Sequence, residues 1–354
     1  GILRFGFDLF DETLLDPKFG VAGWVSEAFE QILEFYPAFK KTDRAHVIRT
    51  YRDGSKTTWM QIFILYLILV GDYGIYWEDN LLPDAKFIRY RGKTFDEADK
   101  KVDTIRMELI TNQKLIRVFG EMTPTFKEVK RLKLRDNVKL MMLKNGKVIR
   151  PFGLNQPSRG DNIRGMRPDI DINDDVEDNK NTKTESLREH NYNDVIGDQF
   201  GGIKDNGMLI NILNLVHPDA MGAKFIKNPD IWRIQDHTAT KFIVDPDTGE
   251  ETEVSDWERR FSVSYYKKLE RFFTRNGKYH IFRREYYNEI ISEMEYKLIY
   301  FNGKYVRREG HNWLEVEQPD GSKKLINCFI VVSADPAISE DKRASDSAIV
   351  VNAF

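Results

Sequence analysis

At 354 residues, the chain exceeds the size at which a single hydrophobic core usually stops growing, so more than one structural unit is expected. Hydrophobic residues make up 41% of it and charged residues 31%, which excludes a disordered or membrane-embedded protein. The 54 basic and 56 acidic side chains leave a net charge of −2, so bulk attraction to nucleic acid is excluded and any contact with DNA must be local.

Cysteine usage and hydropathy exclude several further classes of protein. Cys328 is the single cysteine, which excludes an intrachain disulfide and Cys-based zinc sites and fits a reducing cytoplasm. The first ten residues carry no secretory signal pattern. The longest apolar run, Ile62–Val70, is shorter than the roughly 20 residues of a membrane span. It predicts a helix buried on all sides, and no contact with a membrane is expected.

Strand and helix patterns alternate through the first 220 residues. The dipeptide Asn145-Gly146 between two short apolar runs predicts a β-hairpin within residues 137–151. The repeated order predicts an α/β fold with a mainly parallel sheet. The other predicted elements are helices before residue 45 and over 56–70 and 95–119, and strands over 44–49, 85–90, 168–173 and 208–216.

Beyond residue 224 the pattern changes to charged, aromatic-rich helices, expected over 257–277 and 286–301. Two strands are expected after them, over 324–333 and 348–353. The predicted organisation is a helical entry segment (1–45), an α/β core (46–223), a lid or linker subdomain (224–322) and the start of a further domain (323–354).

Residues 46–70 supply the strand, turn and helix that a phosphate-binding loop needs, because turn N–H groups and a helix N-terminus attract anions. In the usual fingerprint, glycine and four residues precede Gly-Lys-Ser/Thr. Thr50 and Ser55 stand at the glycine positions here, so two interpretations stay open: an exposed basic turn, or a nucleotide site. The nucleotide site would consist of Arg52, Asp53, Gly54, Ser55, Lys56, Thr57 and Thr58.

A run of acidic residues follows the strand predicted before residue 174. Hydrolysis of a nucleotide needs one carboxylate near the metal and one that activates water. Asp174 is the candidate on the metal side, Asp175 the candidate that activates water, and Glu177 a nearby substitute. The alternative is a solvated acidic loop that contains Asp171, Asp174, Asp175, Glu177 and Asp178.

Several segments resemble, in the same order, the large subunits of tailed-phage terminases. The resemblance covers roughly residues 15–354 and implies a P-loop NTPase of the ASCE type, with a mainly parallel sheet flanked by helices. The first strands of an RNase H-like nuclease would follow. The matching segments are Arg52 ahead of Lys56, Ser158-Arg159-Gly160, Arg164–Asp169 with the following Asp-Asp-x-Glu, Asn214–Ala220, Phe282–Asn288 and Phe329–Ala337.

This resemblance implies a motor that uses ATP and Mg²⁺ to move double-stranded DNA into a procapsid. Thr57 and Asp174 would hold Mg²⁺, and Arg52 would stabilise γ-phosphate charge in cis or in trans. Asn214 would couple hydrolysis to movement, although the family usually has Gly-Thr where this chain has Leu213-Asn214. Asp335 would belong to a nuclease site that uses Mg²⁺ or Mn²⁺, complete only in a longer protein, so this chain is expected to lack nuclease activity.

The implied partners are double-stranded DNA, the portal protein, the small terminase subunit and further copies of the chain in a ring, expected to be pentameric. The implied location is the host cytoplasm and, transiently, the portal vertex of the procapsid, but not the mature virion. Two rivals remain: a helicase-like remodeller of nucleic acid, and a capsid- or portal-associated protein with a degenerate ATPase. The missing loop glycines favour the second, whereas Lys56, Thr57, Asp174 and Asp175 argue against it.

Overall fold

The computed structural model describes residues 2–34, 44–73, 85–131, 140–246, 248–291 and the strands within residues 303–353. The chain divides into two compact units, Gly1–Ile290 and Ile291–Phe354. Among the helices of these described residues, none combines the length and the apolar character that a membrane crossing requires.

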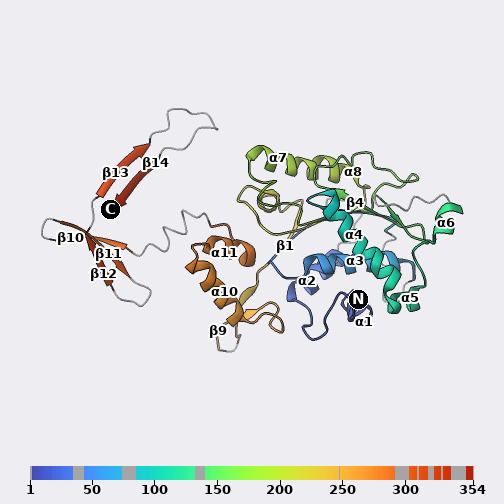
Figure 1. The fold of residues 1–354 in the computed structure, drawn as a ribbon, viewed down its shortest axis with the longest axis horizontal. Coiled ribbons are helices and arrows are strands. Elements are labelled where there is room, and N and C mark those ends of the chain that lie inside the picture. Colours follow the sequence, from blue (N-terminus) through green and yellow to red (C-terminus); the bar gives the residue numbers. More distant parts are fainter. Residues whose placement is uncertain are drawn as a thin grey trace. The chain divides into compact units, whose positions relative to one another are not determined.

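The first unit is built on a seven-stranded sheet in the order β3-β4-β2-β5-β6-β1-β7 (Figure 1). All neighbouring strands are parallel except the β3–β4 hairpin, which confirms the turn expected at Asn145-Gly146. The fold class expected from the sequence, a mainly parallel α/β sheet flanked by helices, is confirmed. The strands are β1 (Ala45–Thr50), β2 (Phe87–Gly92), β3 (Met141–Met142), β4 (Val148–Gly153), β5 (Ile170–Asp174), β6 (Met208–Leu213) and β7 (Arg233–His237).

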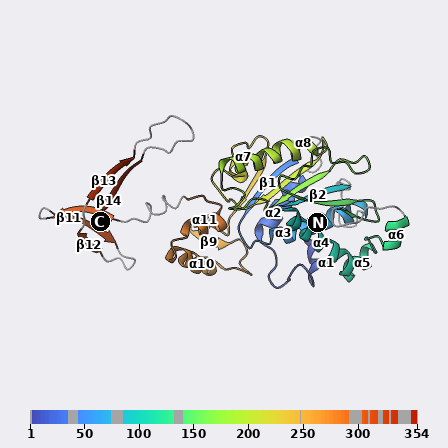
Figure 2. The same ribbon diagram turned by 45° about the horizontal axis from the view of Figure 1, so that its top comes forward.

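Helices cover both faces of this sheet, with α7 and α8 on one side and α2 and α3 on the other (Figure 2). Every residue from Ile62 to Val70 in α3 is buried, as predicted from its unbroken apolar run. The helices are α1 (Ile2–Phe10), α2 (Gly23–Glu34), α3 (Lys56–Tyr73), α4 (Phe95–Thr111), α5 (Gln113–Phe119), α6 (Phe126–Arg131), α7 (Glu185–Asn193), the π-helix η2 (Asp194–Gln199), α8 (Phe200–Gly202), α9 (Met221–Ile226), α10 (Val263–Arg275) and α11 (Tyr279–Tyr287).

The two faces of the sheet differ in polarity because side chains alternate along each strand. On the face toward α3, the central strands present mostly aliphatic side chains, such as Ile88, Ile172 and Ile210. The opposite face, toward η2, carries five buried polar residues at paired positions of β2, β5 and β6. They are Arg89, Arg91, Asp171, Asn173 and Asn211.

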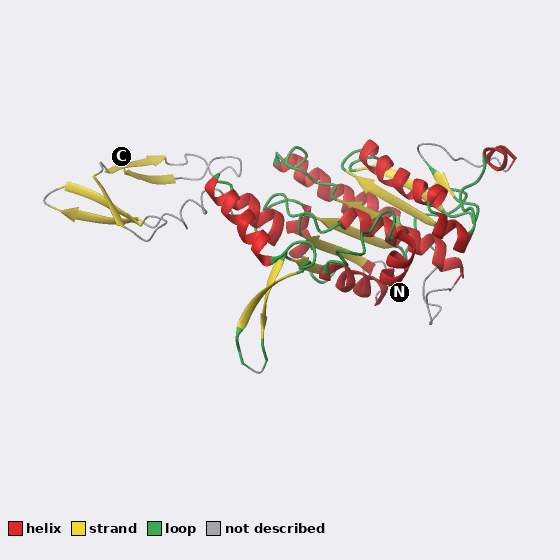
Figure 3. Ribbon diagram, turned by 60° about the horizontal axis from the view of Figure 1, so that its bottom comes forward, coloured by secondary structure: helices red, strands yellow, loops and turns green. Residues whose placement is uncertain are grey.

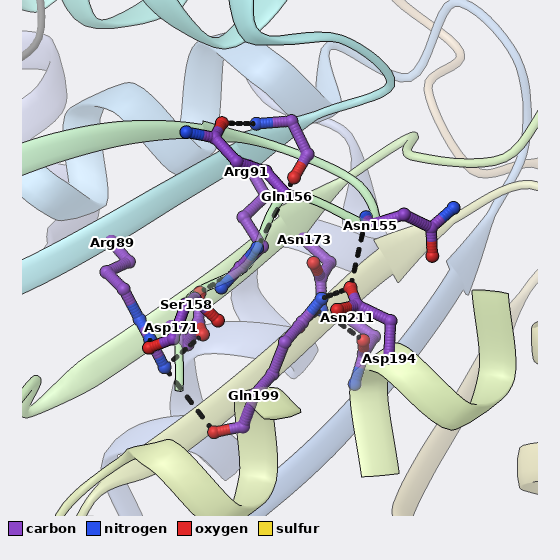
Figure 4. A network of polar contacts seen from close by, with 11 residues as sticks. Arg89, Arg91, Asn155, Gln156, Ser158, Asp171, Asn173, Asp194, Gln199 and Asn211 are labelled. Carbon is purple, nitrogen blue, oxygen red and sulfur yellow. Dashed lines mark hydrogen bonds and ion pairs between the residues drawn. The ribbon is translucent and has the colours of Figure 1, made fainter. Parts of the chain in front are cut away.

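These polar side chains form one network at the centre of the sheet (Figure 4). Asp171 lies 2.6 Å from Arg89 and 2.9 Å from Arg91, and all three side chains are inaccessible to solvent. Arg89 also donates to the carbonyl oxygens of Ser158 and Gln199, while the Asn173 amide donates to the Gln199 side chain at 2.7 Å. These contacts offset part of the cost of taking the charges out of water, while Arg89 Nε and Arg91 Nη2 stay without a hydrogen-bond partner among the described residues. The solvated-loop interpretation is therefore wrong for Asp171.

One predicted helix is interrupted. The helix expected over 95–119 is two helices, α4 and α5, which meet at Asn112. The Asn112 backbone is extended, with φ −74° and ψ 103°, and its side-chain oxygen accepts hydrogen bonds from Lys114 N and Leu115 N. Asparagine is a strong N-cap because its side chain replaces the missing helical partner of these amides. The apolar spacing alone did not indicate this cap.

The helices expected after residue 250 begin and end elsewhere. The helix expected from 257 starts at Val263, because Ser262 accepts from Tyr265 N and caps it. The helix expected from 286 is wrong at its start, because α11 ends at Tyr287 and Asn288 has a left-handed φ of 53°. Residues 292–301 lie outside the described residues.

An antiparallel hairpin that the sequence did not predict precedes α10. It pairs β8 (Thr240–Val244) with β9 (Glu251–Ser255) and is drawn in yellow, like the other strands, in Figure 3.

The second unit contains two small antiparallel sheets. One joins β10 (Gly303–Arg308), β11 (His311–Glu317) and β12 (Lys323–Asn327), and the other pairs β13 (Ile330–Asp335) with β14 (Ala348–Ala353). The strand expected over 324–333 is thus two strands with different partners. A continuous apolar run has no internal periodicity that would mark such a break. The strand expected over 348–353 is present.

Candidate active site

The segments singled out in the sequence meet at one edge of the sheet. β6 lies between β1 and β5, and all three are parallel, so their carboxyl ends share an edge. In open α/β sheets, ligands bind in the crevice outside these ends. A cavity of about 370 Å³ lies there. It is lined by Arg52, Asp53, Lys56, Lys93, Asp175, Glu177, Asp178, Asn179, Asn214, Val216, Arg284 and Glu285.

The loop between β1 and α3 adopts an unusual backbone without the usual glycines. Asp53 and Ser55 have left-handed φ values of 65° and 61°, which cost a residue with a Cβ roughly 1–2 kcal/mol. A side chain at position 54 would be crowded, since a Cβ there would lie 3.1 Å from Trp24 Nε1 and 3.2 Å from the Tyr51 carbonyl oxygen. Trp24 Nε1 also donates to the Gly54 carbonyl at 2.9 Å. Contacts with α2 thus hold the loop in a strained shape, as is common at functional sites.

Lys56, Asp175 and Asn214 form a cluster at the centre of the cavity. The Lys56 side chain is only 7% exposed, and its ammonium group donates to Asp175 Oδ1 at 3.0 Å and to the side-chain oxygen of Asn214. Asp175 Oδ1 also accepts from Asn214 N at 3.2 Å. Three residues from three segments of the sequence therefore meet here. The carboxylate neutralises the lysine, so an anion entering the cavity would compete with Asp175 for the ammonium group.

Asp174 directly precedes Asp175 at the end of β5, and its side chain is fully buried behind the residues that line the cavity. Its Oδ2 atom accepts from Thr57 Oγ1 and from the Tyr90 hydroxyl, both at 2.8 Å, and Lys101 Nζ lies at 2.7 Å from it. Burial, and then Asp174 itself, raise the pKa of Tyr90 well above its usual value, so Tyr90 stays a donor. Asp174 Oδ1 is buried and accepts no hydrogen bond from any described residue. The solvated-loop interpretation is wrong here as well.

Thr57 and Asp174 are the residues here that could hold a metal ion together with a bound ligand. Among the described residues there is no group of three or more His, Cys, Asp and Glu side chains that could hold a metal. Magnesium in nucleotide sites usually takes one or two protein ligands and completes its shell with phosphate oxygens and water. The Thr57 hydroxyl and the free Asp174 Oδ1 would supply that contribution.

Glu177 lines the cavity, but its carboxylate is held by other partners. Oε1 accepts from Asn191 Nδ2 at 3.3 Å and Oε2 from Met221 N at 3.0 Å. Burial raises the pKa of Glu177 to about 7, against the effect of these two hydrogen bonds. The structure thus places Glu177 at the wall of the cavity, outside the cluster around Lys56.

Arg52 faces the cavity from the loop and meets α11. Its backbone N–H donates to the Glu285 carbonyl at 2.8 Å, whereas its guanidinium is 62% exposed and 3.9 Å from the Glu285 carboxylate. Arg284 also lines the cavity and donates to the Val216 carbonyl at 3.2 Å. The sequence of residues 282–288 resembles a family motif, but nothing in it indicated that Arg284 and Glu285 line the same cavity as the loop between β1 and α3.

The remaining candidate residues lie at the margins or elsewhere. Ser55 Oγ accepts from Arg260 at 3.3 Å, and Thr58 is half-buried in the first turn of α3. Asp335 is the last residue of β13 in the second unit, opposite Ala348 of β14. Lys93 and Lys101 were not predicted, and their spacing on a charged, amphipathic segment carried no signal for the site.

Comparisons with known proteins find similar folds among solved structures. No protein-family model matches the chain, and no curated protein matches its sequence. Four solved chains match, and those described here are large terminases of bacteriophages. The HK97 large terminase is 13% identical with a TM-score of 0.41, over 84% of this chain and 67% of that one. The large terminase of a thermophilic bacteriophage is 10% identical with a TM-score of 0.42, over 87% of this chain and 68% of that one.

Proposed function

We propose that the first unit binds and hydrolyses ATP, and that hydrolysis drives double-stranded DNA into a viral procapsid. The observation that carries the ATPase part is the cluster of Lys56, Asp175 and Asn214 at the carboxyl edge of a parallel sheet. The buried ammonium group of Lys56 lies at a helix N-terminus, where a γ-phosphate would bind. The Asp175 carboxylate, once displaced from the ammonium group, would be free to act on an attacking water.

Each residue of the cluster has a distinct role in this proposal. Lys56 exchanges Asp175 for the phosphate oxygens when ATP enters, and stabilises the charge that develops during transfer. Asp175, released from the ammonium group, orients and deprotonates water for in-line attack. The Asn214 side-chain oxygen accepts from Lys56, and its backbone N–H donates to Asp175. When Lys56 and Asp175 separate, Asn214 transmits the change to the adjoining strand β6. Arg52 reaches the γ-phosphate from its exposed position, in cis or across a subunit interface.

Thr57 and Asp174 are the residues that would hold Mg²⁺ in the nucleotide site. The ion, when bound, neutralises charge on the transferred group and orients it. Thr57 keeps its hydroxyl lone pairs available while its hydrogen is donated to Asp174 Oδ2. Asp174 offers Oδ1, which no described residue occupies.

The rival proposal of a degenerate ATPase predicts that the loop without its usual glycines has lost the phosphate-binding arrangement. Against it stands the position of Lys56, within 3.0 Å of Asp175 although 119 residues separate them. DNA packaging rests on the ordered resemblance of the sequence to terminase large subunits. The same resemblance supports the portal, the small subunit and a pentameric ring as partners, the host cytoplasm as location, and a nuclease built around Asp335.

The ATPase proposal is tested by measuring ATP turnover of Lys56→Ala beside Lys100→Ala. Lys100 is an exposed lysine on α4 outside the cavity. Lys56→Ala is expected to reduce turnover at least ~100-fold, the scale seen when one group that stabilises transition-state charge is removed. Lys100→Ala is expected to match the wild type. Equal turnover in the two variants would refute the assignment of Lys56 and with it the proposed site.

A further inference from the structure

Lys101, on the buried side of α4, contacts Asp174 twice. Its ammonium group lies 2.7 Å from Asp174 Oδ2 and donates to the Asp174 carbonyl oxygen at 2.8 Å. These contacts span 73 residues of sequence and join α4 to the end of β5. Lys101 does not line the cavity, and its described side-chain contacts are with Asp174 and the Tyr90 ring.

The contacts on the two oxygens of Asp174 are unequal. Oδ2 is surrounded by three donors, from Thr57, Tyr90 and Lys101, whereas buried Oδ1 has none among the described residues. A fully buried carboxylate is costly unless it is paired and hydrogen-bonded. Lys101 supplies the only formal positive charge among those three donors. All the described hydrogen-bond donors to the Asp174 carboxylate thus contact Oδ2, and Oδ1 has none.

The ammonium group itself is held in place. Gln61 of α3 donates its side-chain N–H to the Lys101 carbonyl at 3.1 Å, which ties the α4 backbone to the helix that follows the phosphate loop. Lys101 Nζ also lies 5.7 Å from the centre of the Tyr90 ring, a cation–π distance. The lysine therefore approaches Asp174 from a fixed direction.

We propose that Lys101 is a positioning residue for the metal of the nucleotide site. It holds Asp174 through Oδ2 and leaves Oδ1, which has no described hydrogen-bond partner, as the oxygen that would hold Mg²⁺. This inference rests on the proposed nucleotide site and extends it to a residue outside the cavity. Partners that orient a metal ligand typically contribute about 10- to 100-fold in metal affinity. Lys101 acts only through Asp174, so nucleotide binding without metal does not depend on it.

The test compares binding of a fluorescent N-methylanthraniloyl ADP to the 354-residue chain over a range of MgCl₂ concentrations and in EDTA. Lys101→Met keeps the length and the apolar stem of the side chain but removes the charge. We expect it to raise the Mg²⁺ concentration for half-maximal enhancement of binding by roughly 10-fold or more, with unchanged affinity in EDTA. Lys101→Arg should lie between Lys101→Met and the wild type. Lys100→Met, one residue away and exposed, is the matched control.

Two results would overturn the inference. An unchanged Mg²⁺ requirement in Lys101→Met would show that Asp174 is oriented without the lysine. Equal weakening with and without Mg²⁺, at an unchanged melting temperature, would assign Lys101 to the pocket in general. If the wild type binds no nucleotide under either condition, the proposed function fails first and the inference fails with it. This outcome can be told apart from a failure of the inference alone, because it is seen in the wild type before any variant is measured.

Discussion

Asp171→Ala is expected to be one of the most destabilising substitutions in the first unit. Asp171 is fully buried between Arg89 and Arg91, at 2.6 and 2.9 Å, and neither guanidinium is accessible to water. Removing one partner of a buried ion pair usually costs about 3–5 kcal/mol, because it leaves an uncompensated charge. Two cations lose their shared carboxylate here, so we expect a loss near the upper end, about 5 kcal/mol. That is comparable to the whole stability of a marginal domain.

The assay is urea unfolding followed by tryptophan fluorescence, with amide hydrogen exchange of β5 as the local readout. Asp8→Ala is the matched control, because it removes an exposed Arg4–Asp8 pair spaced four residues apart on α1. It should cost about 0.5 kcal/mol or less. Replacing Arg89, Arg91 and Asp171 together by Met, Met and Leu should recover much of the loss, since apolar substitutes leave no buried charge. A loss below about 1 kcal/mol in Asp171→Ala would refute the reasoning.

Three further predictions concern the cavity. Asp175→Asn should strongly lower the ATP hydrolysis rate but leave nucleotide affinity unchanged, because it removes the base and leaves the loop between β1 and α3 intact. If a binding titration shows that affinity falls as much as the rate, Asp175 holds the metal or supports the fold instead. Glu177→Gln should remove a pH dependence of the free energy of unfolding. Burial raises the pKa of Glu177 from 4.5 to about 7 in the folded protein. The stability that protonated Glu177 contributes is therefore fully present below pH 4.5 and is lost as the pH rises through 7. Denaturation midpoints of wild type and variant that run parallel between about pH 5 and 8 would contradict this. If Arg52 acts across a subunit interface, ATP turnover per molecule should rise with protein concentration, and this rise should vanish in Arg52→Ala; a concentration-independent rate in the wild type would favour action in cis.

Local patterns in the sequence determined much of the first unit. The apolar run of α3, the Asn145-Gly146 turn and the alternating strand and helix order predicted elements that the structure contains. The acids at 174 and 175 were found because they directly follow a strand. Each of these signals is read from residues that are neighbours along the chain and does not depend on how the elements pack.

Tertiary structure alone decided which polar groups meet. Asp171 could be read as a solvated acid until the register of β2 and β5 placed it between two arginines. Lys101 and Arg284 lie on charged helices whose sequences resemble ordinary solvated faces, yet strand order and helix packing bring them to the same edge of the sheet. Periodicity within one element carries no information about a partner 73 residues away, because that contact depends on how the elements pack against each other.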